Sequence, residues 1–183
     1  MEQFLRLFYI DTIAICQSLS KPLITIVHDY AREGACTLAF AGNLIIASDD
    51  ADFGYPAVPN LAGPPGMHVW FLQRLIGRMK ASELTHTGEP VSSVDASSMG
   101  LITKTVPAAS LDAETLRVAT RIAAMSPLAI KRTRKLIFEM EDMVFSEVPD
   151  VALKALSEAF SSKDSKEARL AFREKRTPNW HKR

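Results

Sequence analysis

The sequence lacks the patterns of metal-binding, disulfide-bonded and membrane-spanning proteins. It has only two cysteines, Cys16 and Cys36, and they form no Cys-x-x-Cys pair, so we expect two reduced thiols in a reducing compartment. The four histidines are scattered outside any His-Glu-x-x-His motif, and the sequence supports no metal site. Residues 53–73, the longest stretch without a charged side chain, contain several prolines. They are not expected to form a spanning helix.

An excess of charge of either sign is also missing. The 22 basic and 21 acidic side chains leave a formal net charge of +1, which gives no general attraction to nucleic acid or to anionic membranes. The apolar segment 1–22 is interrupted by charged residues and does not read as a secretory signal. We therefore expect a cytoplasmic protein without a nucleic-acid or membrane partner. With 183 residues, 47% of them hydrophobic, the chain can bury one well-formed core.

The apolar residues that are present alternate between helix and strand patterns. Phe4, Phe8, Ile15 and Leu19 recur at helical spacing, which predicts an amphipathic helix over residues 3–19. Runs rich in β-branched residues predict buried strands at 23–28 and 44–48, separated by a helix at 34–41, and hence a βαβ unit.

Helices dominate the remainder of the sequence. We expect an irregular loop at 56–66 and a strand-like piece at 101–107. The expected helices are 68–76, 79–87, 94–99, 110–125, 127–143, 151–161 and 164–175. An α/β front half thus passes into a helical tail at about residue 107.

Four segments, in order, resemble the enoyl-CoA hydratase/isomerase (crotonase) superfamily. KPLITIVHDYAREGACTLAFAGNLIIASDDADFGYPAV is similar to the family pattern KP-[VI]-I-A-A-V-N-G-x-A-x-G-G-G-x-E-L-A with its following A-x-F-G-x-P-E. The likeness continues through LQRLIGRMKASELTHTG, MSPLAIKRTRKLI and ARLAFREKRTPNW, from about Lys21 to Arg183. It implies a crotonase-type ββα spiral core in residues 1–107, incomplete at its N-terminus, and a helical C-terminal trimerisation region in residues 108–183.

The resemblance also implies a ligand. Family members bind an acyl-CoA thioester and hold its carbonyl oxygen, or the enolate formed from it, with two backbone N–H groups. Gly34 falls on the second of these donors. A backbone N–H at a helix start has a fixed direction and meets developing negative charge without reorganising. Coenzyme A enters as part of the substrate, and no other cofactor is implied.

Both usual catalytic carboxylates are replaced. The family carries glutamates at the positions of Thr37 and Ala57. Alanine cannot transfer a proton, and a threonine hydroxyl is too weak an acid or base near neutral pH, so two-glutamate hydration is not expected. Glu33 and His68 are the remaining acid/base candidates, although the residues themselves favour a loop role for Glu33 and a packing role for His68. Tyr55 offers a further phenolic hydroxyl, although relatives tolerate many residues at its position, and the sequence assigns none of these side chains a catalytic role.

The C-terminal segment matches positions that contact coenzyme A in relatives. Phe172 and Lys175 fall on these positions, where they serve the same or a neighbouring subunit, and we expect a homotrimer or hexamer. Three readings stay open: an acyl-CoA enzyme, a non-catalytic CoA-ester-binding or interaction subunit, and an inactive truncated member that lacks the family's first third. The side chains suggested for the acyl pocket are Val58, Leu61, Met67 and Trp70.

Overall fold

The computed structural model describes residues 2–181. These residues form two compact units. The first comprises the chain up to Leu19 together with Leu23–Arg117, and the second comprises Ser20–Pro22 together with the chain from Val118 onward. The predicted boundary at residue 107, between an α/β core and a helical C-terminal region, stays a prediction.

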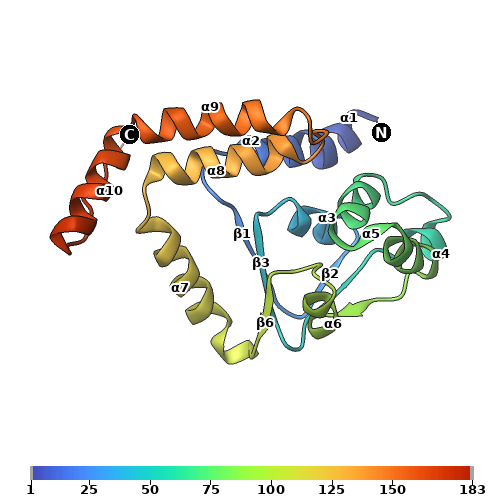
Figure 1. Cartoon of the computed structure of the whole chain (residues 1–183). Helices are drawn as coiled ribbons and strands as arrows, with labels where there is room; N and C mark the ends of the chain where they lie inside the picture. The colour runs from blue at the N-terminus through green and yellow to red at the C-terminus, as the bar shows by residue number, and fades with distance from the viewer. Residues whose placement is uncertain (1, 182–183) are drawn as a thin grey trace. The chain divides into compact units, whose positions relative to one another are not determined.

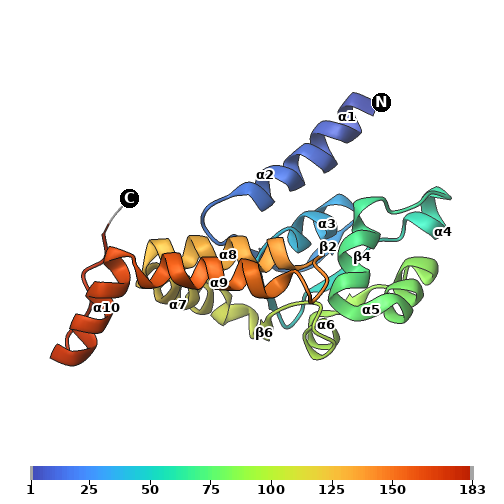
Figure 2. The same ribbon diagram turned by 45° about the horizontal axis from the view of Figure 1, so that its top comes forward.

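The first unit opens with a helical segment that contains a π-helical turn. Helix α1 (Glu2–Leu5) continues through η1 (Arg6–Asp11), a π-helix, into α2 (Thr12–Ser18) (Figure 2). The helix predicted over residues 3–19 is therefore confirmed. Two side chains of its predicted apolar face are exposed instead: Phe4 and Phe8 are 55% and 61% accessible to solvent. A π-helical turn holds more residues than an α-helical turn, which shifts the phase of the pattern, and Tyr9 and Ile13 turn inward instead.

A parallel three-stranded sheet forms the centre of the first unit. Strands β1 (Ile24–Val27), β3 (Leu44–Ser48) and β6 (Lys104–Val106) lie in the order β1-β3-β6 (Figure 1). Helix α3 (Gly34–Phe40) connects β1 to β3, so the predicted βαβ unit is confirmed. The middle strand is buried almost throughout, as its unbroken apolar run requires in a parallel sheet.

A second, smaller sheet was missed by the sequence patterns. Strand β2 (Tyr30–Arg32) pairs in parallel with β4 (Asp52–Gly54), which pairs antiparallel with β5 (Val91–Ser92). Strands this short carry too few residues to show an alternation. An ion pair between Arg32 and Asp52 joins β2 to β4.

Short helices complete the first unit. Helix α4 (Ala57–Leu61) occupies part of the segment predicted to be an irregular loop, which corrects that prediction. Helix α5 (Met67–Thr87) is interrupted at Gly77, where φ is 77° and ψ is 160°, so the two helices predicted there are separated as expected. Helix α6 (Ser93–Ser98), the 3₁₀ turn η2 (Ala108–Ser110) and the start of α7 (Leu111–Ala123) follow.

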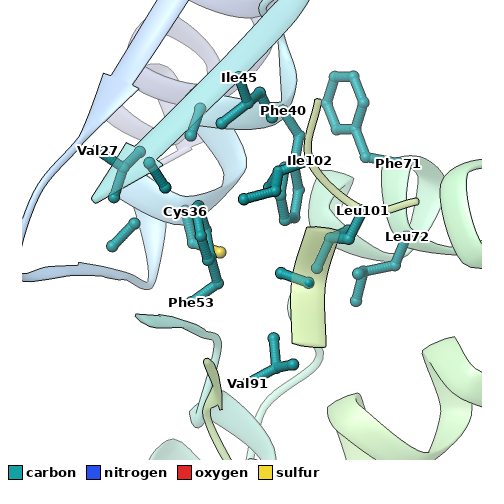
Figure 3. Packing of buried hydrophobic residues seen from close by; sticks show 14 of the residues in the cluster. Val27, Cys36, Phe40, Ile45, Phe53, Phe71, Leu72, Val91, Leu101 and Ile102 are labelled. Atoms are coloured by element: carbon teal, nitrogen blue, oxygen red, sulfur yellow. The ribbon is translucent and has the colours of Figure 1, made fainter. Parts of the chain in front are cut away.

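The core of the first unit lies between the two sheets and α5. Figure 3 shows Phe40 from α3, Phe53 from β4 and Leu72 from α5 converging with Leu101 and its neighbours. The Phe40 and Phe53 rings stack with their centroids 6.2 Å apart. This packing fixes α3 and the β4 turn against each other, and these are the two elements that carry the predicted site.

The second unit is helical, as predicted. Helices α8 (Pro127–Met140) and α9 (Val148–Phe160) pack together, with Arg132 and Glu158 3.4 Å apart, and α10 (Lys163–Glu174) follows (Figure 1). Ser126 and Ser162 cap α8 and α10 through their hydroxyls. Among residues 2–181, no helix is both long and apolar enough to cross a bilayer.

Candidate functional site

Gly34 begins α3 at a backbone position that is held by strand β4. The preceding residue, Glu33, donates its N–H to the Gly54 carbonyl at 3.1 Å and has φ 52° and ψ −125°. The first N–H groups of a helix have no partner inside the helix, and Gly34 is the first residue of α3. Helix α3 has only seven residues, so the direct N–H contact matters here more than the helix dipole. The donor role itself stays a prediction.

The structure brings two of the predicted residues together in the interior. Thr37 lies one turn into α3, and its hydroxyl oxygen is 3.2 Å from Nδ1 of His68 at the start of α5. Both side chains are buried, at 1% and 3% accessibility. The His68 ring stacks on Phe40 at 5.3 Å and lies 4.7 Å from the Tyr55 ring. Burial lowers the pKa of His68 to about 4, so its imidazole is neutral at pH 7.

A small cavity lies beside His68. Its free space for water centres is about 10 Å³, roughly the room that one water molecule needs. The lining residues are Cys36, Phe40, Phe53, Gly54, Tyr55, His68, Leu72, Leu84, Glu89, Val91 and Leu101. Of these, Glu89 is the only carboxylate, and the sequence patterns did not point to it. Ala57 starts α4 and is buried at 3%.

The side chains predicted to form acyl-pocket walls lie elsewhere. None of the four is among the residues that line this cavity. Leu61 is 70% exposed, whereas Met67 and Trp70 pack against the hydrophobic core. The prediction rested only on their apolar character, and apolar side chains are common both in the core and on the surface of proteins.

Two tyrosines meet beside Gly34, and one of them was not predicted. A methyl group at Gly34 would lie 3.0 Å from the Tyr9 hydroxyl oxygen and 3.3 Å from its ring. The Tyr55 hydroxyl hydrogen-bonds with Tyr9, and burial together with this bond raises the pKa of Tyr55. Tyr55 therefore stays protonated at neutral pH and can donate a hydrogen bond. Glu33 is near enough to Tyr55 to raise its pKa further by charge.

The buried thiol of Cys36 is not a nucleophile. Burial raises its pKa to about 12, against a smaller lowering by its hydrogen bond with the Gly54 backbone. A thiol in this state is inert at neutral pH. Neither cysteine forms a disulfide. Among the described residues, no cluster of three histidine, cysteine or carboxylate side chains could hold a metal ion.

The predicted coenzyme A contacts belong to the second unit. Phe172 projects from α10 with 88% of its side chain exposed, and Lys175 ends that helix in a left-handed conformation with φ 54°. The following residue, Arg176, pairs with Glu167 at 2.6 Å and lowers the pKa of that carboxylate to about 2. Part of the basic C-terminal segment is thus neutralised. Gly34 belongs to the first unit, and Phe172 and Lys175 belong to the second.

A buried carboxylate fixes the chain after α10. Asp164 accepts a hydrogen bond from the Ser126 hydroxyl and one from the backbone N–H of His181 at 3.2 Å. These bonds, the one from Ser126 first, lower the pKa of Asp164 despite its burial. Trp180 also donates its indole N–H to the Ala124 carbonyl at 2.7 Å. These contacts explain why the C-terminal segment turns back over its own unit.

The chain resembles known proteins over nearly its whole length. The sequence profile of the enoyl-CoA hydratase/isomerase family matches residues 3–183, so the likeness begins well before Lys21, where the motifs first suggested it. A probable mitochondrial enoyl-CoA hydratase from Dictyostelium discoideum is 35% identical over 164 residues, which are 89% of this chain and 59% of that protein. A probable enoyl-CoA hydratase from Bacillus subtilis is 34% identical over 169 residues, 90% of this chain and 64% of that protein.

Solved structures agree with this result. An enoyl-CoA hydratase subunit from Geobacillus kaustophilus superposes with a TM-score of 0.90 at 32% identity, covering 98% of this chain and 69% of that one. Human enoyl-CoA hydratase domain-containing protein 3 gives a TM-score of 0.88 at 28% identity over 92% of this chain and 66% of its own. The fold is the crotonase-type α/β fold with a helical C-terminal region, and the chain spans about 60% of the curated relatives' length. By its sequence profile and its fold, this chain belongs to the enoyl-CoA hydratase/isomerase family.

Proposed function

We propose that this protein binds an acyl-CoA thioester and holds its carbonyl oxygen at the Gly34 N–H. The observation that carries the proposal is the backbone at the start of α3. There Gly34, which the motif resemblance aligns with the family's second donor, begins α3, and its position is tied to β4 through the neighbouring N–H of Glu33. A donor held in place before the ligand arrives needs no reorganisation to meet negative charge.

The proposed activity does not include hydration by a carboxylate pair. Thr37 and Ala57 stand at the two positions, and both are buried. His68 bonds Thr37 and has a pKa of about 4, so it is not a protonated acid at pH 7. Two carboxylates are close in sequence or in space: Glu33 precedes Gly34, and Glu89 lines the cavity. Glu33 accepts a hydrogen bond from the Thr37 hydroxyl at 3.4 Å, but through its backbone carbonyl and not through its carboxylate.

A second candidate is a CoA-ester-binding protein without turnover. The small cavity favours it, because the space lined by His68 and Tyr55 has room for about one water molecule. Oxyanion binding without proton transfer fits this arrangement. The two candidates share the same binding step and differ only in whether a bond is changed afterwards.

The test is a calorimetric titration of the 183-residue chain with butyryl-CoA, followed by a hydration assay with crotonyl-CoA. We expect saturable binding near one ligand per chain and no loss of the crotonyl absorbance above background. Free CoA serves as the control ligand, because it lacks the carbonyl that Gly34 would hold. Equal affinity for CoA and butyryl-CoA would refute carbonyl binding, and rapid hydration would refute the non-hydratase assignment.

We also propose that the chain assembles as a homotrimer or hexamer. Helix α9 supports this with three apolar side chains at helical spacing, Leu153, Leu156 and Phe160, which are 67%, 55% and 65% exposed. Such a stripe is costly to leave in water. Light scattering on the same sample measures the mass directly, and a monodisperse monomer would refute the proposal.

A further inference from the structure

The Tyr9 side chain lies against Gly34, the first residue of α3. A side chain at position 34 would have its Cβ atom 3.0 Å from the Tyr9 hydroxyl oxygen and 3.4 Å from the ring carbon that bears it. Contacts this short are tighter than most Cβ contacts, so a substituent would displace the phenol. The glycine thus allows both a close backbone approach and a phenol beside it.

The chain is shaped locally to place this phenol. Within residues 2–10, Tyr9 is the only side chain that is not classed as exposed. It belongs to η1, the π-helical turn Arg6–Asp11, and π-helical turns are rare features that recur at functional sites. Ile13 on α2 is buried at 3% and anchors the same helical segment to the core. Tyr9 therefore has a defined position and is not part of a freely solvated helix.

A second phenol orients the first. The Tyr55 side chain hydrogen-bonds with Tyr9, and its ring lies against His68 at 4.7 Å. Each phenol can donate one hydrogen bond and accept another. When Tyr55 donates to the Tyr9 oxygen, the Tyr9 proton is free to point at a third atom, and donors in such a chain strengthen one another.

We propose that the Tyr9 hydroxyl donates a hydrogen bond to the same thioester oxygen that the Gly34 N–H holds, with Tyr55 as the residue that positions it. Gly34 and Tyr9 would then supply two donors to one oxygen, from the backbone of α3 and from the side chain of η1. The inference rests on the proposed function, because it concerns the oxygen of the acyl-CoA thioester. No bond is made or broken in the protein, and the phenolic proton stays on Tyr9.

The enolate of a 3-oxoacyl thioester provides a direct readout. Acetoacetyl-CoA ionises to an enolate that absorbs in the ultraviolet, and donors at its oxygen raise the enolate-to-keto ratio of the bound ligand. Removing one donor from an oxyanion site typically costs about 10²–10³ in rate. For Tyr9→Phe we expect the ratio to fall by roughly tenfold or more on the same physical grounds. For Tyr55→Phe we expect a smaller fall.

A matched control is available in the same chain. Tyr30 on β2 is 69% exposed, so Tyr30→Phe removes an equivalent hydroxyl away from Gly34 and should leave the ratio unchanged. Circular dichroism checks that all three variants fold. A Tyr9→Phe ratio equal to that of Tyr30→Phe would overturn the inference and leave the proposed function standing. Failure of the unmodified protein to bind acetoacetyl-CoA in calorimetry would instead overturn the proposed function, and the inference with it.

Discussion

Replacing Glu33 with glycine should stabilise the protein. Glu33 has φ 52° and ψ −125°, a conformation that glycine adopts readily and a residue with a Cβ atom does not. Residues held in such regions typically cost about 1–3 kcal/mol. The Glu33 side chain makes no capping hydrogen bond to α3, so its removal sacrifices no cap. The resemblance to the family points the same way, because glycine is usual at this position.

The expected gain in the free energy of unfolding is the backbone strain that is released, less the free energy lost because glycine makes the unfolded chain more flexible. Glycine in place of another residue costs about 0.4–1 kcal/mol through the unfolded state, so the roughly 1–3 kcal/mol of strain leaves a net stabilisation of up to about 2.6 kcal/mol. For a chain of this size, 1 kcal/mol raises the melting temperature by roughly 2–4 °C. Urea unfolding measures the free energy, and an unchanged slope against urea shows that the unfolding transition itself has not changed.

Glu33→Ala separates the backbone effect from the charge effect. Alanine removes the carboxylate but keeps the Cβ atom that causes the strain, so it should leave the free energy of unfolding within about 0.5 kcal/mol. If Glu33→Ala stabilises as much as Glu33→Gly, the carboxylate beside Tyr55 is the cause and the strain argument fails. A destabilising Glu33→Gly would refute it outright.

Three further outcomes are expected. His68 has a pKa of about 4 in the folded protein against about 6.5 when unfolded, so stability should be full above pH 6.5 and fall by up to about 3 kcal/mol as the pH drops to 4. The free energy of unfolding of His68→Gln, measured by urea titration at each pH, should not show this loss between pH 6.5 and 4. Thr37→Val should lower the free energy of unfolding by about 1–3 kcal/mol, because it leaves His68 without its hydrogen-bond partner. In a double-mutant cycle with His68→Phe the two free-energy changes should be coupled, and additive changes would contradict the contact. Leu156→Glu should reduce the mass seen in light scattering, while Ser157→Glu on the same helix should not.

The local parts of the fold could be predicted because they have local causes. The β-branched run of β1, the small residues of α3 and the stop at Gly42 define a βαβ unit without tertiary information. Strands β2 and β5 have three and two residues, too few for any periodicity. Their existence depends on pairing with β4, which a single sequence does not reveal.

The residues of the candidate site were predicted from a local pattern and from the family resemblance. The helix start at Gly34 is a local feature and is confirmed, whereas its donor role came from the resemblance and stays a prediction. The contact between Thr37 and His68 joins residues 31 positions apart, and no pattern in the sequence connects them. Tyr9 was hidden for another reason: the π-helical turn breaks the 3.6-residue phase, so the predicted apolar face pointed to the wrong side chains of its helix.

The side chains at the site limit which acyl-CoA ligands can form an enolate when bound. The positions expected to hold carboxylates carry an alanine and a threonine, and two titratable side chains that line the cavity, His68 and Tyr55, have pKa values shifted so that both are neutral at pH 7. Hydrogen-bond donors can stabilise an enolate, but they cannot remove a proton from a weakly acidic carbon. A 3-oxoacyl thioester, whose α-carbon is acidic enough to ionise in water, should therefore form an enolate here, whereas a saturated acyl-CoA should bind unchanged. Hydrogen–deuterium exchange at the α-carbon of bound butyryl-CoA distinguishes the cases, since rapid exchange would require a carboxylate such as Glu33 or Glu89 to act as the base and would contradict this expectation.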